Sequence, residues 1–106
     1  MSSLEDKLVS DCVSGISIIK SSGIHYIEFG VFGSFARNEV NAASDIDFVI
    51  IVDEIPDRNK LGLLRDKLET VNCDLLVLLR ETFNNPDSLI SKNVKRDYKR
   101  VSYYEE

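Results

Sequence analysis

The spacing of hydrophobic positions changes several times along the chain, and each change indicates a new element. Residues 4–19 place apolar side chains at helical spacing, and the polar and glycine residues 21–23 end that pattern. Residues 24–32 are rich in β-branched and aromatic side chains, which predicts a strand leading into Gly33. Residues 46–52 begin with a short alternation and become continuously apolar, as expected of a strand buried on both faces.

The second half of the chain continues in the same way. Asp57 is a good N-cap for a helix that carries leucines at helical spacing, Leu61, Leu64 and Leu68. Residues 72–79 predict a third buried strand, residues 84–87 open a last helix with Leu89, Ile90 and Val94 as its apolar positions, and residues 101–104 are expected to be extended. The order of these elements indicates an α/β (α+β) domain, a small mixed sheet flanked by helices, with strands 46–52 and 72–79 as neighbours.

Composition narrows the class of protein without specifying it. A chain of 106 residues is predicted to form one domain, 1–106, and a formal charge of -5 argues against an extended nucleic-acid surface. Cys12 and Cys73 are far apart and His25 is the only histidine, so we expect two reduced thiols rather than a zinc site. The first residues lack a basic segment followed by an apolar run, and we expect a cytoplasmic protein without membrane spans.

Two aspartates stand where the strand at residues 46–52 begins. Because successive side chains of a strand alternate between its faces, Asp45 and Asp47 share one face. Two carboxylates at the entry of a buried strand repel each other and lose hydration, and a divalent cation removes that repulsion. The alternative is a solvated strand start. Asp74 stands in the same position at the next strand, either as a third carboxylate or as an exposed turn residue.

A glycine and a serine come directly after the first predicted strand. Gly33 allows a sharp turn or a close approach to a ligand, and Ser34 can cap a short helix over residues 35–37 whose free amides would face an anion. Arg37 is either a surface cation or a group that reaches a triphosphate or braces the carboxylates. Ser44 is expected to make a local hydrogen bond, with any contact to a nucleotide secondary.

Together these residues resemble a known signature. Gly33-Ser34, ten further residues and then Asp45-x-Asp47 resemble the motif of the DNA-polymerase-beta-type nucleotidyltransferases. The longer string, including Arg37 and Ser44, looks most like the minimal nucleotidyltransferase (MNT) subfamily, which implies that residues 1–106 form one minimal nucleotidyltransferase domain with a polymerase-beta-like core. Asn38 stands where close relatives often have glycine, a small departure because asparagine tolerates a left-handed conformation.

The resemblance implies an activity. ATP would be the substrate, with two magnesium ions: one on Asp45 and Asp47, where the triphosphate is held, and one bridged to Asp74, where the attacking hydroxyl is activated. MNT proteins are usually paired with an all-helical HEPN protein, often as the antitoxin of a toxin–antitoxin module. The implied reaction is therefore transfer of AMP to a tyrosine of a HEPN ribonuclease toxin. Two alternatives are an antitoxin that acts by binding alone, and a transferase for a small molecule such as an antibiotic.

Two features stay open at this level. The chain is short for a nucleotide core with its own acceptor domain, so the acceptor surface is expected from a partner or from a second copy in a homo-oligomer. The basic cluster Lys92–Arg100 is either a solvated helix face or a docking surface for an acidic partner.

Overall fold

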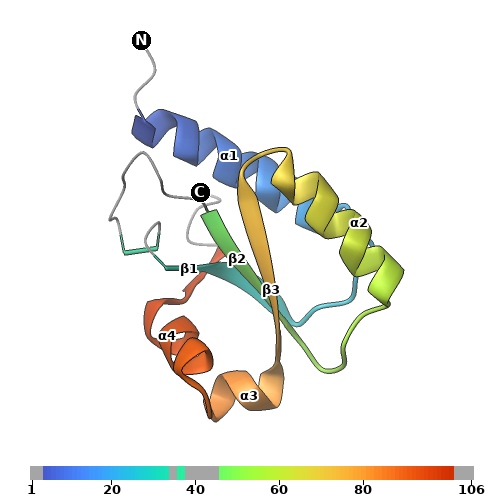
Figure 1. The fold of residues 1–106 in the computed structure, drawn as a ribbon, viewed down its shortest axis with the longest axis vertical. Helices are drawn as coiled ribbons and strands as arrows, with labels where there is room; N and C mark the ends of the chain where they lie inside the picture. The colour runs from blue at the N-terminus through green and yellow to red at the C-terminus, as the bar shows by residue number, and fades with distance from the viewer. Residues whose placement is uncertain (1–3, 34–35, 38–45, 102–106) are drawn as a thin grey trace.

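A mixed sheet of four strands organises the domain (Figure 1). In this computed structural model, residues 4–33, 36–37 and 46–101 are described. In chain order the elements are α1 (Leu4–Lys20), β1 (Glu28–Phe32), β2 (Ile46–Val52), α2 (Arg58–Glu69), β3 (Cys73–Leu79), α3 (Arg80–Asn84), α4 (Leu89–Asp97) and β4 (Lys99–Arg100). The strand order is β3-β2-β1-β4, with β2 and β3 parallel and the other pairs antiparallel. The predicted mixed sheet flanked by helices is thereby confirmed.

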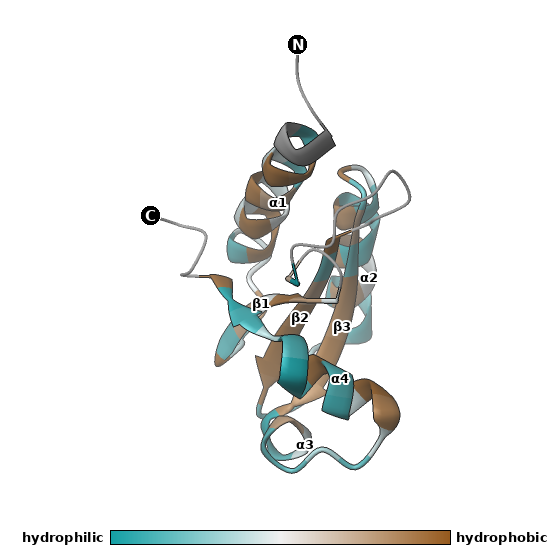
Figure 2. Cartoon of the chain, turned by 90° about the vertical axis from the view of Figure 1, so that its left-hand side faces the viewer, coloured by the Kyte–Doolittle hydropathy of each residue, from teal (hydrophilic) through white to brown (hydrophobic). Residues whose placement is uncertain are grey.

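The central strand β2 is buried on both faces, as its apolar run predicts. Ile46, Phe48, Ile50 and Val52 pack in the main core with apolar residues of α1 and α2, among them Leu8, Cys12, Ile16, Ile19, Leu61, Leu64 and Leu68. The alternate residues Val49 and Ile51 point to the other face and are also buried. On this side α3 contacts β2 and β3 while α4 contacts β1, and Figure 2 shows the strands as the most hydrophobic layer.

Gly15 brings α1 close to the sheet. A glycine inside a helix lowers its intrinsic stability, and on that ground alone it weakens the prediction of a helix. Here a β-carbon at Gly15 would lie 2.5 Å from Cε2 of Phe48 and 3.2 Å from Sγ of Cys73. The missing side chain therefore lets the helix axis approach the core more closely than alanine would allow.

Several predicted boundaries are wrong. The first strand covers Glu28–Phe32 rather than residues 24–32, although the amide of Ile27 still donates to Ile51 O at 2.8 Å. The short helix α3 was not predicted, and α4 begins after residues 84–87, at Leu89, because Ser88 and Ser91 form a capping box there. A short strand, β4, precedes the extended segment predicted at 101–104; Val101 itself is not in a strand, and residues 102–104 lie outside the described part of the chain.

Edges of the domain carry more exposed apolar surface than the sequence predicts. β3 is an edge strand, and its residues 75–78 are half-buried rather than buried because no strand covers its outer side. On α4, Leu89 and Ile90 are 75% and 61% exposed, so only Val94 of the predicted apolar positions enters the core. None of the helices in the described ranges is long and apolar enough to cross a bilayer.

The two cysteine thiols are buried, which leads to a prediction about their reactivity. Cys12 and Cys73 are each 2% exposed, and burial raises the pKa of the Cys12 thiol to about 11. Because the thiolate is the reactive form, we expect both to react with a disulfide reagent at pH 8 at least about a hundredfold more slowly in the native protein than in urea. Spectrophotometric thiol titration measures this. Rapid labelling of either thiol without denaturant would contradict the described burial.

Candidate functional site

Two aspartates meet on neighbouring strands. In the parallel pair β2–β3, Asp47 and Asp74 are register partners, so their carboxylates project from the same face of the sheet on strands about 4.8 Å apart. Asp47 is half-buried and Asp74 is exposed. The face they share is opposite to the one that Phe48 fills in the core. The prediction that the strands of these two carboxylates are neighbours is confirmed by the topology.

The turn after β1 lies against Asp47. Phe32 is the register partner of Asp47, and the next residue, Gly33, has a φ of 78°. A β-carbon on Gly33 would lie 2.9 Å from Oδ2 of Asp47. The Gly33 carbonyl accepts a hydrogen bond from the Arg37 amide at 3.1 Å, and the short helix predicted over residues 35–37 lies partly outside the described residues. Gly33 is therefore required both for backbone conformation and for the close approach.

Substituting Gly33 separates these two requirements. Gly33→Ala is expected to lower the free energy of unfolding by about 2 kcal/mol, because a left-handed conformation with a β-carbon costs about 1–2 kcal/mol and the contact with Asp47 adds to it. Gly23→Ala is the matched control, since Gly23 has a φ of 76° but nothing within 4 Å of an added β-carbon. Urea unfolding of both variants measures the difference. An equal loss in the two variants would mean that the Asp47 contact carries no strain.

The side chain of Arg37 reaches the end of α4. Its Nη1 donates to Oδ2 of Asp97 at 2.8 Å. The carboxylate of Asp97 is only 4% exposed, and Arg96 also binds it, with Nε 3.0 Å from Oδ1. These hydrogen bonds and charges, that of Arg96 first, hold the pKa of Asp97 below its usual value although burial opposes them.

Sequence reasoning missed Asp97, although a signal for it exists. Ser91, Val94 and Asp97 are spaced three apart and are the buried residues of α4. An acidic residue at the spacing of the apolar face must have a cationic partner inside the fold. Asp97 lies within the basic cluster Lys92–Arg100, and its burial was not predicted because a run of cations is usually a solvated face.

Within the basic cluster, two arginines bind carboxylates of the domain itself. Arg96 contacts Asp97, and Arg100 Nε lies 3.2 Å from Oε2 of Glu28 on β1. Part of the positive charge of the cluster is therefore used in ion pairs within the domain, where α4 and β4 pack against β1.

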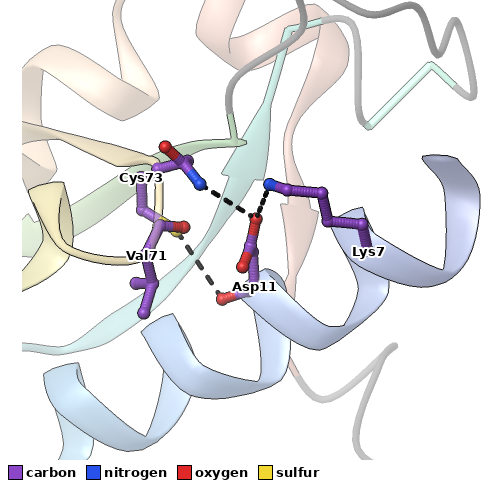
Figure 3. Close-up of polar contacts among 5 residues, drawn as sticks. Lys7, Asp11, Val71 and Cys73 are labelled. Carbon is purple, nitrogen blue, oxygen red and sulfur yellow. Dashed lines mark hydrogen bonds and ion pairs between the residues drawn. The ribbon is translucent and has the colours of Figure 1, made fainter.

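The start of β3 is fastened to α1 (Figure 3). Asp11 accepts hydrogen bonds from Lys7 Nζ at 2.9 Å and from Asn72 Nδ2 at 3.4 Å, and Cys73 Sγ lies 3.7 Å from the Asp11 carbonyl oxygen. Asn72 has a φ of 58°, a left-handed conformation that asparagine tolerates. These contacts fix the turn directly before Asp74.

Two hollows lie at opposite ends of β2. One, of about 210 Å³, lies at the start of β3 and is lined by Arg65, Glu69, Cys73, Asp74 and Leu75, so it includes Asp74 but not Asp47. The other, of about 420 Å³, lies where β2 ends, and its lining includes Asp53 and Asp57. Those carboxylates have partners already, since Asp53 pairs with Arg80 and Asp57 caps α2. The larger hollow therefore lies away from the candidate chemistry.

The donor set at the aspartate end suits a hard divalent cation. Asp47 and Asp74 provide carboxylate oxygens, the ligands that Mg²⁺ prefers. Within the described ranges no group of three His, Cys, Asp or Glu side chains gathers to hold a metal. The predicted third donor, Asp45, and the predicted nucleotide contacts Ser34 and Ser44 lie outside those ranges.

Comparison with known proteins shows the family. A model of the nucleotidyltransferase domain matches residues 16–105, and the chain belongs to this family. Its members transfer nucleotidyl groups from nucleoside triphosphates and generally use a divalent metal ion. The chain is 34% identical over 68 residues to a Methanocaldococcus jannaschii protein named "Putative protein adenylyltransferase MJ0128", covering 63% of this chain and 67% of that protein.

Solved structures agree on the fold. A minimal nucleotidyltransferase superposes with a TM-score of 0.59 at 20% identity, over 90% of this chain and 93% of that one. A nucleotidyltransferase from Sulfolobus solfataricus gives a TM-score of 0.59 at 18% identity, over 95% of this chain and 88% of that one.

Proposed function

We propose that this protein transfers AMP from ATP to a hydroxyl group of a partner protein, using magnesium ions held by Asp45, Asp47 and Asp74. The observation that carries the proposal is the register pairing of Asp47 with Asp74, with the Gly33 turn closely packed against the first of them. Membership of the nucleotidyltransferase family supports the reaction class, and the name of the M. jannaschii relative supports a protein as acceptor.

The residues have distinct roles in this reaction. Bound magnesium neutralises the triphosphate and stabilises the leaving pyrophosphate. Asp47 and Asp45 would hold the magnesium ion at the triphosphate end, and the segment from Gly33 to Arg37 would position the phosphates. Asp74 takes the proton of the acceptor hydroxyl. The acceptor oxygen then bonds to the α-phosphorus, and the bond from that phosphorus to the bridging oxygen breaks, so its electron pair leaves with pyrophosphate.

The acceptor in this proposal is a tyrosine of a HEPN ribonuclease, and the protein acts as its antitoxin. Resemblance of the signature to the MNT subfamily supports this partner. An AMP group adds bulk and negative charge, which would repel RNA from the neighbouring cleavage site. The exposed position of Asp74 supports an acceptor that comes from outside the domain.

Calorimetric titration of ATP with and without magnesium tests the site without knowledge of the partner. We expect magnesium-dependent binding that is lost in the Asp45→Asn, Asp47→Asn double variant. The matched control, Asp53→Asn with Glu54→Gln, removes two charges from the far end of β2 and is expected to keep the affinity. An absence of binding at millimolar ATP would overturn a nucleotide site in the protein alone.

Mass spectrometry of a co-expressed HEPN partner tests the acceptor. The expected result is an increase by one or more AMP groups on a tyrosine-containing peptide, dependent on the intact aspartates. A partner that stays unmodified in a stable complex would contradict the transfer and indicate an antitoxin that acts by binding.

A further inference from the structure

We propose that Asp97 is a positioning residue for the nucleotide site: its carboxylate holds Arg37, whose amide binds the Gly33 carbonyl, in the geometry that binds MgATP. This inference rests on the proposed function, and it adds a residue from the opposite end of the chain, sixty positions from Arg37, to the same site.

The first support is the contact itself. Arg37 Nη1 and Asp97 Oδ2 are 2.8 Å apart, the distance of a charge-assisted hydrogen bond. The Arg37 side chain is 39% exposed while that of Asp97 is 4% exposed, so the carboxylate is the fixed partner and the guanidinium extends from it toward solvent. A buried carboxylate without its cations would be strongly unfavourable, which keeps Arg37 in this place.

The second support is the strand register. β4 pairs antiparallel with β1, with Val31 opposite Lys99 and Gly30 opposite Arg100. Asp97 ends α4 two residues before Lys99, and Gly33 follows Val31 by two residues, so the paired positions bring the end of α4 near Gly33. The sheet therefore brings the end of α4 to the turn independently of the ion pair.

The third support is the closed path of contacts. The Arg37 amide binds the Gly33 carbonyl at 3.1 Å, and the Arg37 side chain binds Asp97. Arg37 thus binds Gly33 through its backbone amide and α4 through its side chain. Gly33 in turn lies against Asp47, so displacement of Arg37 is transmitted to the carboxylate proposed to hold the triphosphate end.

A double-mutant cycle on MgATP affinity tests whether Asp97 acts through Arg37. We expect Asp97→Asn to raise the Kd about tenfold in the wild-type background and less than about twofold in the Arg37→Gln background. Glu28→Gln is the matched control, because it removes the Arg100–Glu28 ion pair that also joins β4 to β1 and leaves the turn untouched. It is expected to change the Kd by less than about twofold. A purely structural role of Asp97 would weaken binding equally in both backgrounds.

Three outcomes would overturn the inference: an unchanged Kd in Asp97→Asn, an equal effect of that substitution in the Arg37→Gln background, or an unchanged Kd in Arg37→Gln. The Kd of Arg37→Gln tests the inference even if Asp97→Asn does not fold. Because Arg37 is partly exposed, this substitution is expected to leave the fold intact. Hydrogen exchange of the Arg37 amide provides a second test, which needs no ATP. Faster exchange in Asp97→Asn is expected, and unchanged exchange would contradict the positioning role. Failure of the wild-type protein to bind MgATP would instead overturn the proposed function.

Discussion

Asp47→Asn is expected to abolish nucleotidyl transfer, lowering the rate at least about a thousandfold while the fold remains intact. An amide has nearly the same shape as the carboxylate but has no negative charge for a metal ion. The site would therefore lose the neutralisation of the triphosphate while the strand keeps its packing, because Asp47 is half-buried on the face away from the main core.

Label transferred from α-³²P-ATP to a separately expressed HEPN protein, the acceptor proposed above, measures this loss, with circular dichroism as the test of folding. The control is Asp53→Asn. Asp53 follows the other end of β2 and pairs with Arg80, and both side chains are about 60% exposed, so its removal is expected to change stability and transfer little. Full activity of Asp47→Asn would mean that the metal-binding assignment of Asp47 is wrong.

Phe48→Ala is expected to lower the free energy of unfolding by about 3–5 kcal/mol, a large part of the total stability of a small domain. Phe48 is fully buried in the central strand, and its ring lies 6.3 Å from that of Phe29, measured between centroids. Gly15 approaches the same ring closely from α1, so the helix backbone cannot move further in to fill the cavity without large rearrangement.

Urea unfolding measures this effect, and Leu63→Ala is the control. Leu63 is 63% exposed on α2, so its truncation is expected to cost less than about 0.5 kcal/mol. A loss below about 1.5 kcal/mol for Phe48→Ala would contradict the close packing of α1 over the sheet. Because Phe48 directly follows Asp47 on β2, the same experiment measures how much the packing of this one ring stabilises the strand that carries Asp47.

The elements that could be predicted are those with long, regular patterns. β2 and β3 follow from continuous apolar runs, and the common face of Asp47 and Asp74 follows once their strands are placed in parallel register. α3 could not be predicted in this way because five residues are too few for a periodic pattern. The two residues of β4, Lys99 and Arg100, have no β-preference and pair only because β1 presents its free edge to them.

The part of the candidate site that depends on distant pairing was not predictable. From the sequence, several carboxylates of the chain could pair with Arg37. Its pairing with Asp97 depends on where α4 ends. That end is set by the capping box at Ser88 and by the register of β4, both of which are tertiary or boundary details. The predicted roles of Asp47, Asp74, Gly33 and Arg37 stay predictions, as do those of Ser34, Ser44 and Asp45.

The pairing of β1 with β4 also has a consequence for the order in which the domain folds. It joins residues 30 and 100, so the loop that must close spans 70 of the 106 positions of the chain. Such contacts have a high entropic cost and tend to form late, after local contacts such as those between β2, α2 and β3. During synthesis, Arg37 leaves the ribosome well before Asp97 does. In a nascent chain the parallel strands β2 and β3 would therefore form before Asp97 can bind Arg37. The proposed nucleotide site would be complete only after α4 has been synthesised and has packed against the sheet.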